Sequence, residues 1–217
     1  MNKFDFDNAA GNYDDFYNNP FGQQIDVLEK RIISGYLKRL ESKVLVELGC
    51  GTGHWTSFFT TEGFTVIGLD ISIKMLETAK LKNIPGSILM KQDIHLLPFL
   101  DNSIENIVVV AVIEFVEDQD KVFSEIKRVL KPGGAFIIGC ININSQLGKT
   151  KSENDVFRDA DFFSSDSLNI QLSKFGKPEI HGCVYLTEKN EILDEKADEE
   201  QLLKNGSFLA GLVYKEN

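Results

Sequence analysis

Three glycines at alternate positions follow a short apolar run in the first quarter of the chain. Residues 44–48 are Val, Leu, Val, Glu and Leu, and Gly49, Gly51 and Gly53 come directly after them. Such a run is typical of a buried parallel strand, and glycines let the backbone turn sharply and approach a ligand without intervening Cβ atoms. Residues 54–61 can follow as a helix whose first N–H groups point into the same crevice. The stretch predicts a ligand site at the carboxyl end of a first strand.

Acidic residues recur at the ends of the next two predicted strands. Residues 64–69 form a strand that ends in Asp70, and residues 87–90 form another that precedes Asp93. A carboxylate at the Asp70 position can accept hydrogen bonds from both ribose hydroxyls of an adenosine. A dinucleotide G-x-G-x-x-G fingerprint would need a third glycine at position 54, where this chain has His54.

The spacing Glu47-x-Gly49-x-Gly51-x-Gly53 resembles the first motif of class I S-adenosylmethionine (SAM)-dependent methyltransferases. Later stretches resemble further motifs of that family: residues 70–76, 97–103 and 130–134. The chain looks most like the small-molecule, type-11 methyltransferase group over roughly residues 40–140. The resemblance implies SAM as cofactor and S-adenosylhomocysteine (SAH) as product, with Asp93 receiving the adenine amino group. The cofactor-binding residues that it implies are Glu47, Gly49, Cys50, Gly51, Gly53, Asp70, Ile71, Met75, Asp93, Ile94 and Val110.

The order of predicted elements indicates one α/β domain over residues 1–217. We predict a doubly wound, Rossmann-like, seven-stranded and mainly parallel sheet with helices on both faces; the resemblance implies that the last strand is antiparallel. One further helix is expected after Asn19-Pro20, and another after Ser72, with Ile73, Leu76 and Ala79 facing inward. Three more are expected: over 119–130, after 162–165 and, as a short helix, in the acidic stretch 188–200. The fourth strand and its exit are expected over 104–116, and further strands over 135–140, 178–187 and 207–214. Residues 1–40 form an N-terminal helical and lid segment, 41–140 the cofactor-binding core, and 141–217 the substrate-side part with the last strands.

No residue pattern identifies a catalytic group. Related methyltransferases frequently carry Glu-His or His-His beyond the fourth strand, whereas this chain has Glu114 and Phe115. Glu114 is a candidate general base, but because it begins a helix beside other acids, we interpret it as a solvated or dipole-complementing residue. The three histidines are isolated, and we interpret each as structural. Without Cys-x-x-Cys pairs the three cysteines are read as free thiols, and no metal site is predicted.

Composition narrows the classes of partner. A net charge of −10 argues against a nucleic-acid substrate and favours a small-molecule acceptor. No apolar stretch approaches the ~20 residues that span a bilayer, and the N-terminus lacks a secretory pattern. We therefore expect a cytoplasmic protein without a membrane partner; the sequence leaves the oligomeric state open.

Two segments mix aromatic with polar residues and are expected near the mouth of the crevice. Residues 1–21 and 142–161 together are predicted to form a mobile lid that determines acceptor specificity. The candidate acceptor contacts are Tyr13, Tyr17, Phe157 and Arg158, the last because its guanidinium can pair an anionic group.

The function predicted from these features is methyl transfer from SAM to a small molecule, driven mainly by proximity and alignment. Two alternatives stay open at this point. One is a nicotinamide-dependent oxidoreductase, and the other is a SAM-binding regulatory module without turnover.

Overall fold

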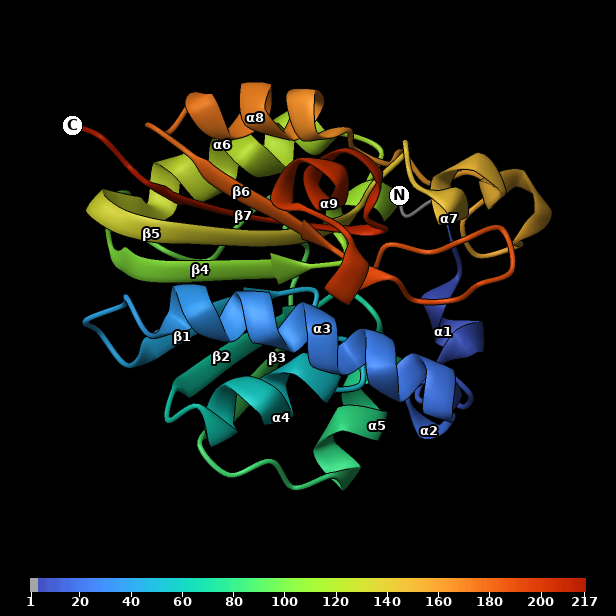
Figure 1. Ribbon diagram of the computed structural model, residues 1–217. Coiled ribbons are helices and arrows are strands. Elements are labelled where there is room, and N and C mark those ends of the chain that lie inside the picture. The colour runs from blue at the N-terminus through green and yellow to red at the C-terminus, as the bar shows by residue number, and fades with distance from the viewer. Residues whose placement is uncertain (1–3) are drawn as a thin grey trace.

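The computed structural model describes residues 4–217, which fold around one sheet of seven strands (Figure 1). In chain order these are β1 (Val44–Leu48), β2 (Thr65–Asp70), β3 (Ser87–Lys91), β4 (Ile104–Val110), β5 (Leu130–Ile141), β6 (Glu179–Cys183) and β7 (Phe208–Tyr214). Their order across the sheet is β3-β2-β1-β4-β5-β7-β6. Strands β1 to β5 pair in parallel, and β7 runs antiparallel between β5 and β6. The predicted Rossmann-like sheet, including the antiparallel last strand, is confirmed.

The helices begin where the sequence supplies caps. They are α1 (Phe6–Ala9), α2 (Asp15–Asn18), α3 (Pro20–Leu37), α4 (His54–Thr61), α5 (Ile73–Leu81), α6 (Gln119–Val129), α7 (Gln146–Lys149), α8 (Ser165–Ser173) and α9 (Glu199–Asn205), with 3₁₀ turns η1 (Ile113–Phe115), η2 (Lys151–Glu153) and η3 (Asp194–Lys196). The side chain of Asn19 accepts from the Gly22 N–H at 2.9 Å, and Pro20 opens α3. Ser72 caps α5 in the same way, accepting from the Met75 N–H at 3.1 Å.

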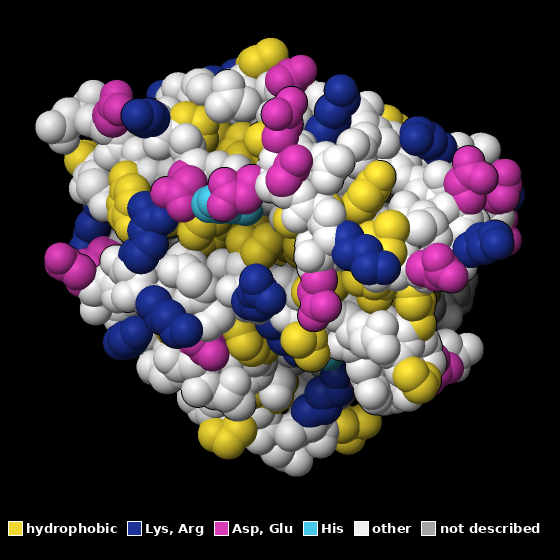
Figure 2. Space-filling view, viewed as in Figure 1, with side chains coloured by type: hydrophobic (Ala, Val, Ile, Leu, Met, Phe, Trp, Pro, Cys, Tyr) yellow, Lys and Arg dark blue, Asp and Glu magenta, His cyan; other side chains and the backbone are white. Residues whose placement is uncertain are grey.

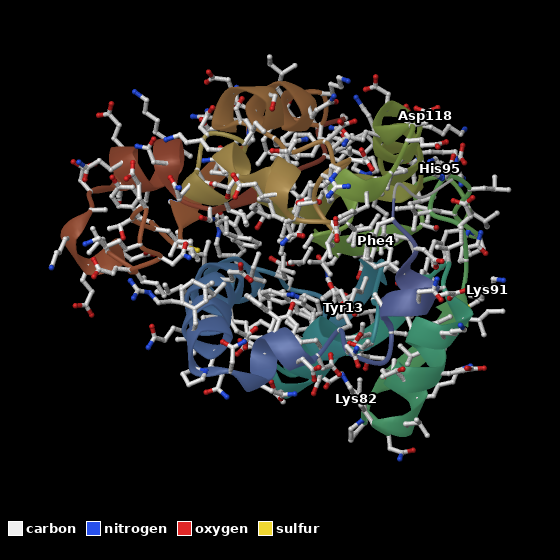
Figure 3. All side chains as sticks on the ribbon, turned by 90° about the vertical axis from the view of Figure 1, so that its right-hand side faces the viewer. Phe4, Tyr13, Lys82, Lys91, His95 and Asp118 are labelled. Carbon is white, nitrogen blue, oxygen red and sulfur yellow. The ribbon has the colours of Figure 1, made fainter. Side chains whose placement is uncertain are left out.

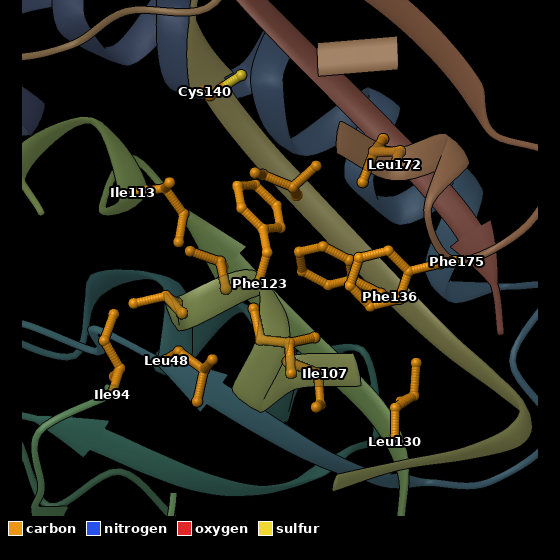
Figure 4. Close-up of a cluster of buried hydrophobic side chains, with 14 of the residues drawn as sticks. Leu48, Ile94, Ile107, Ile113, Phe123, Leu130, Phe136, Cys140, Leu172 and Phe175 are labelled. Carbon is orange, nitrogen blue, oxygen red and sulfur yellow. The ribbon is translucent and has the colours of Figure 1, made fainter. Parts of the chain in front are cut away.

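Apolar side chains fill both faces of the sheet. Helices α6 and α8 cover one face, where Phe123, Phe136 and Phe175 pack among strand residues such as Leu48 and Ile107 (Figure 4). Helices α3 and α4 cover the other face with a second buried cluster. Since a parallel sheet buries both of its surfaces, its strands have the uninterrupted apolar pattern seen in the sequence.

Three predicted details differ from the structure. Ile73 was expected to face inward but is 49% exposed, because α5 buries Met75, Leu76 and Ala79 instead. Strand β5 begins at Leu130, since Leu130 already pairs with Ile104 before the turn at Gly133. Strand β6 is shorter than predicted and ends at Cys183.

The two predicted lid segments lie at the same end of the sheet. In Figure 1 helices α1, α2 and α7 lie on the side toward which the arrow of β4 points. That edge carries the carboxyl ends of the parallel strands, where open α/β sheets bind ligands. Residues 1–3 of the first lid segment lie outside the described residues.

The surface carries mixed charge, and Figure 2 shows Lys and Arg interspersed with Asp and Glu on one face. Within residues 4–217 no helix combines the length and apolarity needed to cross a bilayer. The same residues include no cluster of three His, Cys, Asp or Glu side chains able to hold a metal ion. The thiols of Cys50, Cys140 and Cys183 are free and buried.

Candidate cofactor and acceptor site

A cavity opens at the carboxyl ends of β1, β2, β3 and β4. It encloses about 820 Å³ of empty space, its open mouth included. Residues from five parts of the chain line it: Phe6, Tyr13, Tyr17, Gly49, Cys50, Gly51, Thr52, His54, Trp55, Asp70, Ile71, Met75, Gln92, Asp93, Ile94, His95, Val110, Ala111, Val112, Phe115 and Val116. In Figure 3, which views this end of the molecule, Tyr13 and His95 lie on either side of the α1 segment.

The glycine loop keeps the backbone close to the neighbouring strand and to the cavity. Gly49 has a φ of 73°, and a Cβ there would lie 2.3 Å from the Val112 side chain, so only glycine fits. At Gly51, with φ 52°, a Cβ would meet nothing within 4 Å and would project into open space. Gly53 differs because a Cβ there would collide with Ile84. Gly53 therefore serves the packing of α4 against α5 and does not line the cavity.

Asp70 connects the glycine loop to the start of α5. Its Oδ2 accepts from the Gly51 N–H at 2.8 Å, and its Oδ1 accepts from the Ser72 N–H at 2.8 Å. Burial raises the pKa of Asp70, although these backbone hydrogen bonds act against that rise. Because a carboxylate has about four acceptor positions, both oxygens still have capacity for ligand hydroxyls.

Asp93 lies at the β3 side of the cavity and is paired with a histidine. Its Oδ1 accepts from the His95 backbone N–H at 2.9 Å and lies 2.6 Å from Nδ1 of the same residue. Burial raises the pKa of Asp93, but the two His95 contacts outweigh it and hold the value below the ordinary one. Asp93 is thus an ionised acceptor at the cavity edge.

Glu47 lies beneath the loop and does not line the cavity. It is 3% exposed, and the Thr56 hydroxyl donates to its Oε2 at 2.5 Å. Burial raises the pKa of Glu47 to about 8, and the nearby Asp70 adds to the rise. The remaining predicted cofactor residues, Cys50, Ile71, Met75, Ile94 and Val110, all line the cavity. Burial also raises the pKa of the Cys50 thiol, which makes it a poor nucleophile.

Acidic side chains attach the N-terminal segment to the cofactor core. The Ser72 hydroxyl donates to Asp7 at 2.5 Å, and the Thr52 hydroxyl donates to Asp14 at 2.6 Å. Asp14 also forms an ion pair with Lys82 at 2.6 Å. These contacts place α1 and α2 over the glycine loop and the first turn of α5.

Tyr17 stacks on His54, the residue that replaces the third glycine of a dinucleotide motif. The two ring centroids are 3.6 Å apart with an interplanar angle of 9°. Asp26 Oδ1 lies 2.7 Å from His54 Nε2, and Lys30 lies 2.7 Å from the other oxygen of Asp26. His54 is therefore held in place by α3 and in turn supports the predicted lid residue Tyr17.

A row of aromatic rings joins the two predicted lid segments through Phe115. The ring centroid of Phe115 lies 5.1 Å from that of Phe6 and 6.2 Å from that of Phe157. Both separations are within the range of favourable aromatic pairs. The ring of Phe115 separates Phe157 from the cavity. Arg158 is exposed and forms an ion pair with Asp155. Of the four predicted acceptor contacts, Tyr13 and Tyr17 line the cavity, and Phe157 and Arg158 do not.

The interpretation of Glu114 as a solvated residue is wrong. Its side chain is fully buried in η1, because the chain folds back after β4 and is covered by the 142–161 segment. The Ile141 N–H donates to Glu114 Oε1 at 2.7 Å, and the Asp161 N–H donates to its carbonyl. Burial raises the pKa of Glu114 to about 7.

Several cavity residues were not predicted from the sequence. Trp55 and His54 open α4, and Phe115 and Phe6 come from segments that are far apart in the chain. The position after the third glycine is the one local signal that identifies His54 and Trp55. No spacing rule connects Phe6 with Phe115, since their contact depends on how the N-terminal segment folds back.

The fold and the cavity together form a binding site for a cofactor that contains a nucleoside. The site consists of the glycine loop after β1 and of two acids at the ends of β2 and β3. The open space at Gly51 and the negative charge of the lining residues suit SAM. Residues 46–138 match the family model described as "Methyltransferase domain".

Relatives and solved structures agree with that match. An uncharacterised protein of Methanocaldococcus jannaschii is 29% identical over 209 residues, covering 94% of this chain and 96% of that protein. Demethylmenaquinone methyltransferase of Staphylococcus saprophyticus is 34% identical over 137 residues, which cover 61% of this chain and 58% of that enzyme. A SAM-dependent methyltransferase from Thermotoga maritima, described as a possible histamine N-methyltransferase, has a TM-score of 0.75 at 23% identity and covers 97% of each chain. Residues 46–138 thus carry a methyltransferase domain, the whole chain has the fold of SAM-dependent methyltransferases, and SAM is its cofactor.

Proposed function

We propose that this enzyme transfers the SAM methyl group to a small molecule that binds at the end of the cavity formed by Tyr13 and Tyr17. The observation that carries the proposal is the continuity of one cavity from Asp93, past the glycine loop, to these two tyrosines. Its lining combines apolar side chains with a few polar groups, as small-molecule sites do. The net charge of −10 and the small-molecule substrate in the name of the Staphylococcus relative also support a small acceptor.

The residues for cofactor binding are assigned by their chemistry. In this proposal Asp70 accepts the ribose hydroxyls and Asp93 the adenine amino group. The glycine loop gives the methionine part access to the backbone, while Met75 and Ile94 supply apolar contacts. Glu47 accepts a hydrogen bond from Thr56 behind the glycine loop and stabilises the loop without contacting the ligand.

Bound SAM supplies a methyl group already activated by a positively charged sulfur. The protein then has to align the acceptor and exclude water, which together lower the barrier by several kcal/mol. The N-terminal segment and the 142–161 segment suit this role, because the aromatic row through Phe115 joins them over the cavity. In the proposal they close as one lid.

Calorimetry with SAM, SAH and NAD tests the cofactor assignment. We expect SAM and SAH to bind and NAD to show no heat of binding. A metabolite extract incubated with isotopically labelled SAM, followed by mass identification of labelled products, then tests turnover on a small molecule. Binding of NAD without SAM would overturn the proposal, and label found only in macromolecules would exclude the small acceptor.

A further inference from the structure

Aromatic side chains form most of the proposed acceptor end of the cavity. Six rings line it in two groups whose members contact one another: Tyr17, His54 and Trp55 in one, and Tyr13, Phe6 and Phe115 in the other. The ring centroids are 3.6 and 6.3 Å apart in the first group, and 6.5 and 5.1 Å apart in the second. A planar ring placed there can make stacked and edge-to-face contacts that a saturated skeleton cannot make.

Among the described residues that line the cavity, none at this end carries a fixed charge. The lining includes neither Lys nor Arg, and its two carboxylates belong to Asp70, which ends β2, and to Asp93, which follows β3. His95, the partner of Asp93, lies across the α1 segment from Tyr13 (Figure 3). Because a buried ion without a partner of opposite charge costs free energy, this end favours an uncharged acceptor.

The His54 ring at this end has one nitrogen left for a ligand. Burial raises the pKa of Asp26, but its contacts with His54 and Lys30 outweigh that effect and hold the value below the ordinary one. An ionised carboxylate only accepts hydrogen bonds, so the 2.7 Å contact between Asp26 Oδ1 and His54 Nε2 places a proton on Nε2. The Lys30 ammonium, 3.0 Å from Nε2, donates instead to the other oxygen of Asp26 at 2.7 Å. In this neutral tautomer Nδ1 is the acceptor, and the hydrogen-bond contacts of the ring with residues 4–217 all involve Nε2.

Other side chains near this end are unsuited to accept a proton from a ligand. Burial raises the pKa of Tyr13 to about 12 and raises that of Tyr17 as well, so both hydroxyls keep their protons. The buried thiol of Cys50 keeps its proton for the same reason. Glu114 is fully buried and does not line the cavity. His54 is therefore the proton acceptor available to a substrate at this end.

We infer that the methyl acceptor is an uncharged aromatic compound that carries a hydroxyl group, with its ring among these aromatic side chains and its hydroxyl donating to His54 Nδ1. The inference rests on the proposed function and specifies its substrate class. An aliphatic alcohol could make the same hydrogen bond but would lose the contacts between rings. An ionic acceptor would be buried without a counter-charge.

The same arrangement provides for the proton that a hydroxyl nucleophile must release. The O–H bond breaks with its electrons kept by oxygen, and the proton moves to His54 Nδ1. The oxygen bonds to the methyl carbon while the bond from that carbon to sulfur breaks, with its electrons kept by sulfur. The products are a methyl ether, SAH and an imidazolium whose charge is balanced by Asp26.

Five small probes test the inference by calorimetry on SAH-saturated protein: phenol, cyclohexanol, anisole, benzoate and benzylamine. Cyclohexanol keeps the hydroxyl but lacks the aromatic ring, and anisole keeps the ring but has no hydroxyl hydrogen. At neutral pH benzoate is an anion and benzylamine a cation. Phenol should bind at least about fivefold more tightly than cyclohexanol, and at least about tenfold more tightly than either ion.

Two variants locate the bound probe. Tyr17→Leu should weaken phenol binding by about fivefold and change cyclohexanol binding by less than about twofold. His54→Phe keeps a flat ring against Tyr17 but removes both nitrogens, so it should weaken phenol binding by about fivefold and change anisole binding by less than about twofold. The matched controls are Tyr214→Leu and His181→Phe, because neither of these residues lines the cavity.

The outcomes separate this inference from the proposed function. If SAH does not bind, the proposed function fails. If SAH binds but no probe does, or if cyclohexanol, benzoate or benzylamine binds as tightly as phenol, only the assignment of the acceptor is overturned. Equal losses of phenol and anisole affinity in His54→Phe, shown to be folded by its thermal melt, overturn it as well.

The extract assay with labelled SAM gives an independent test of the same class. We expect the labelled product to absorb as an aromatic compound and to pass through both anion and cation exchangers at neutral pH, because a methyl ether of an uncharged acceptor has no charge. A labelled product that is retained by either exchanger would contradict the inference, while its formation would still support methyl transfer to a small molecule.

Discussion

The two ends of the cavity are built from different kinds of contact. At the adenosine end, Asp70 accepts from two backbone N–H groups, and Gly49 lies directly against Val112. At the proposed acceptor end, side chains from distant segments meet: Tyr17 stacks on His54, and Phe6 packs on Phe115. The adenosine end is held by contacts of the backbone at the edge of the sheet. The acceptor end is held by contacts between side chains, so it can open when these side chains separate. We therefore expect cofactor binding and acceptor access to change independently.

The largest expected effect is at the adenosine end, from Gly51→Val. The valine side chain would project into the open space of the cavity from a residue with φ 52°. We expect SAM affinity measured by calorimetry to fall by at least about a hundredfold while the fold persists.

Gly63→Val is the matched control, because Gly63 also has a positive φ, of 88°, and nothing lies within 4 Å of an added Cβ. Both variants carry similar backbone strain, but Gly63 follows α4 and is absent from the cavity lining. Equal loss of SAM affinity in the two variants would mean that strain, and not occlusion, is responsible.

Asp70→Ala should have the next largest effect on the same end. It removes two charge-assisted hydrogen bonds to the ribose, each worth roughly 1.5–3 kcal/mol, so SAM affinity should drop at least about tenfold. Asp93→Ala should act in the same direction but more weakly, since its carboxylate is shared with His95. Asp120→Ala on the surface serves as control, and unchanged affinity in Asp70→Ala would refute the assignment.

Glu47 provides a pH-dependent test of the loop support. Its folded pKa of about 8 lies above the ordinary value of 4.5, so the folded protein retains a proton that the unfolded chain has released. This stabilisation is fully present below about pH 4.5 and is lost as the pH rises through 8. The free energy of unfolding without ligand should therefore fall between pH 5 and 8, and Glu47→Gln should reduce the fall by roughly 2–4 kcal/mol. Denaturant titrations at both pH values measure this; an unchanged pH dependence in the variant would show that Glu47 ionises normally.

Phe115→Ala tests whether the acceptor end moves as one unit. In the wild type, SAH should raise hydrogen-exchange protection in residues 4–21 and 142–161 together. Removing the ring that links Phe6 with Phe157 should leave the rise in 4–21 and abolish most of it in 142–161. Phe162→Ala is the control, because that ring contacts Phe157 but not the N-terminal segment. Protection confined to residues 47–94 in the wild type would mean that no lid exists.

The smallest expected effect is that of Arg158→Ala. The guanidinium is exposed and paired with Asp155 in the same loop, and exposed ion pairs contribute about 0–1 kcal/mol. Turnover of the acceptor, once identified by the labelled-product assay, should change by less than about twofold. A large loss of turnover would show that the loop reorganises to bring Arg158 into the cavity.

Local sequence signals predicted the framework of the cofactor end. The apolar run 44–48, the following glycines and the helix 54–61 correspond to β1, the loop and α4 with the predicted bounds. The caps Asn19 and Ser72 start α3 and α5 as expected. These features follow from residues within a few positions of one another, where propensity, capping and apolar spacing act directly.

The sequence by itself determined the class of fold, the cofactor loop and the acids at the ends of β2 and β3, because each is signalled by the types and spacing of residues that are close together in the chain. Only the tertiary structure decided that Glu114 is buried and that Phe6 contacts Phe115. Burial of a carboxyl depends on which segments fold over it, and here the contacts of Glu114 come from the end of β5 and from the 142–161 segment. These contacts are a product of long-range packing, which no local spacing of residues encodes.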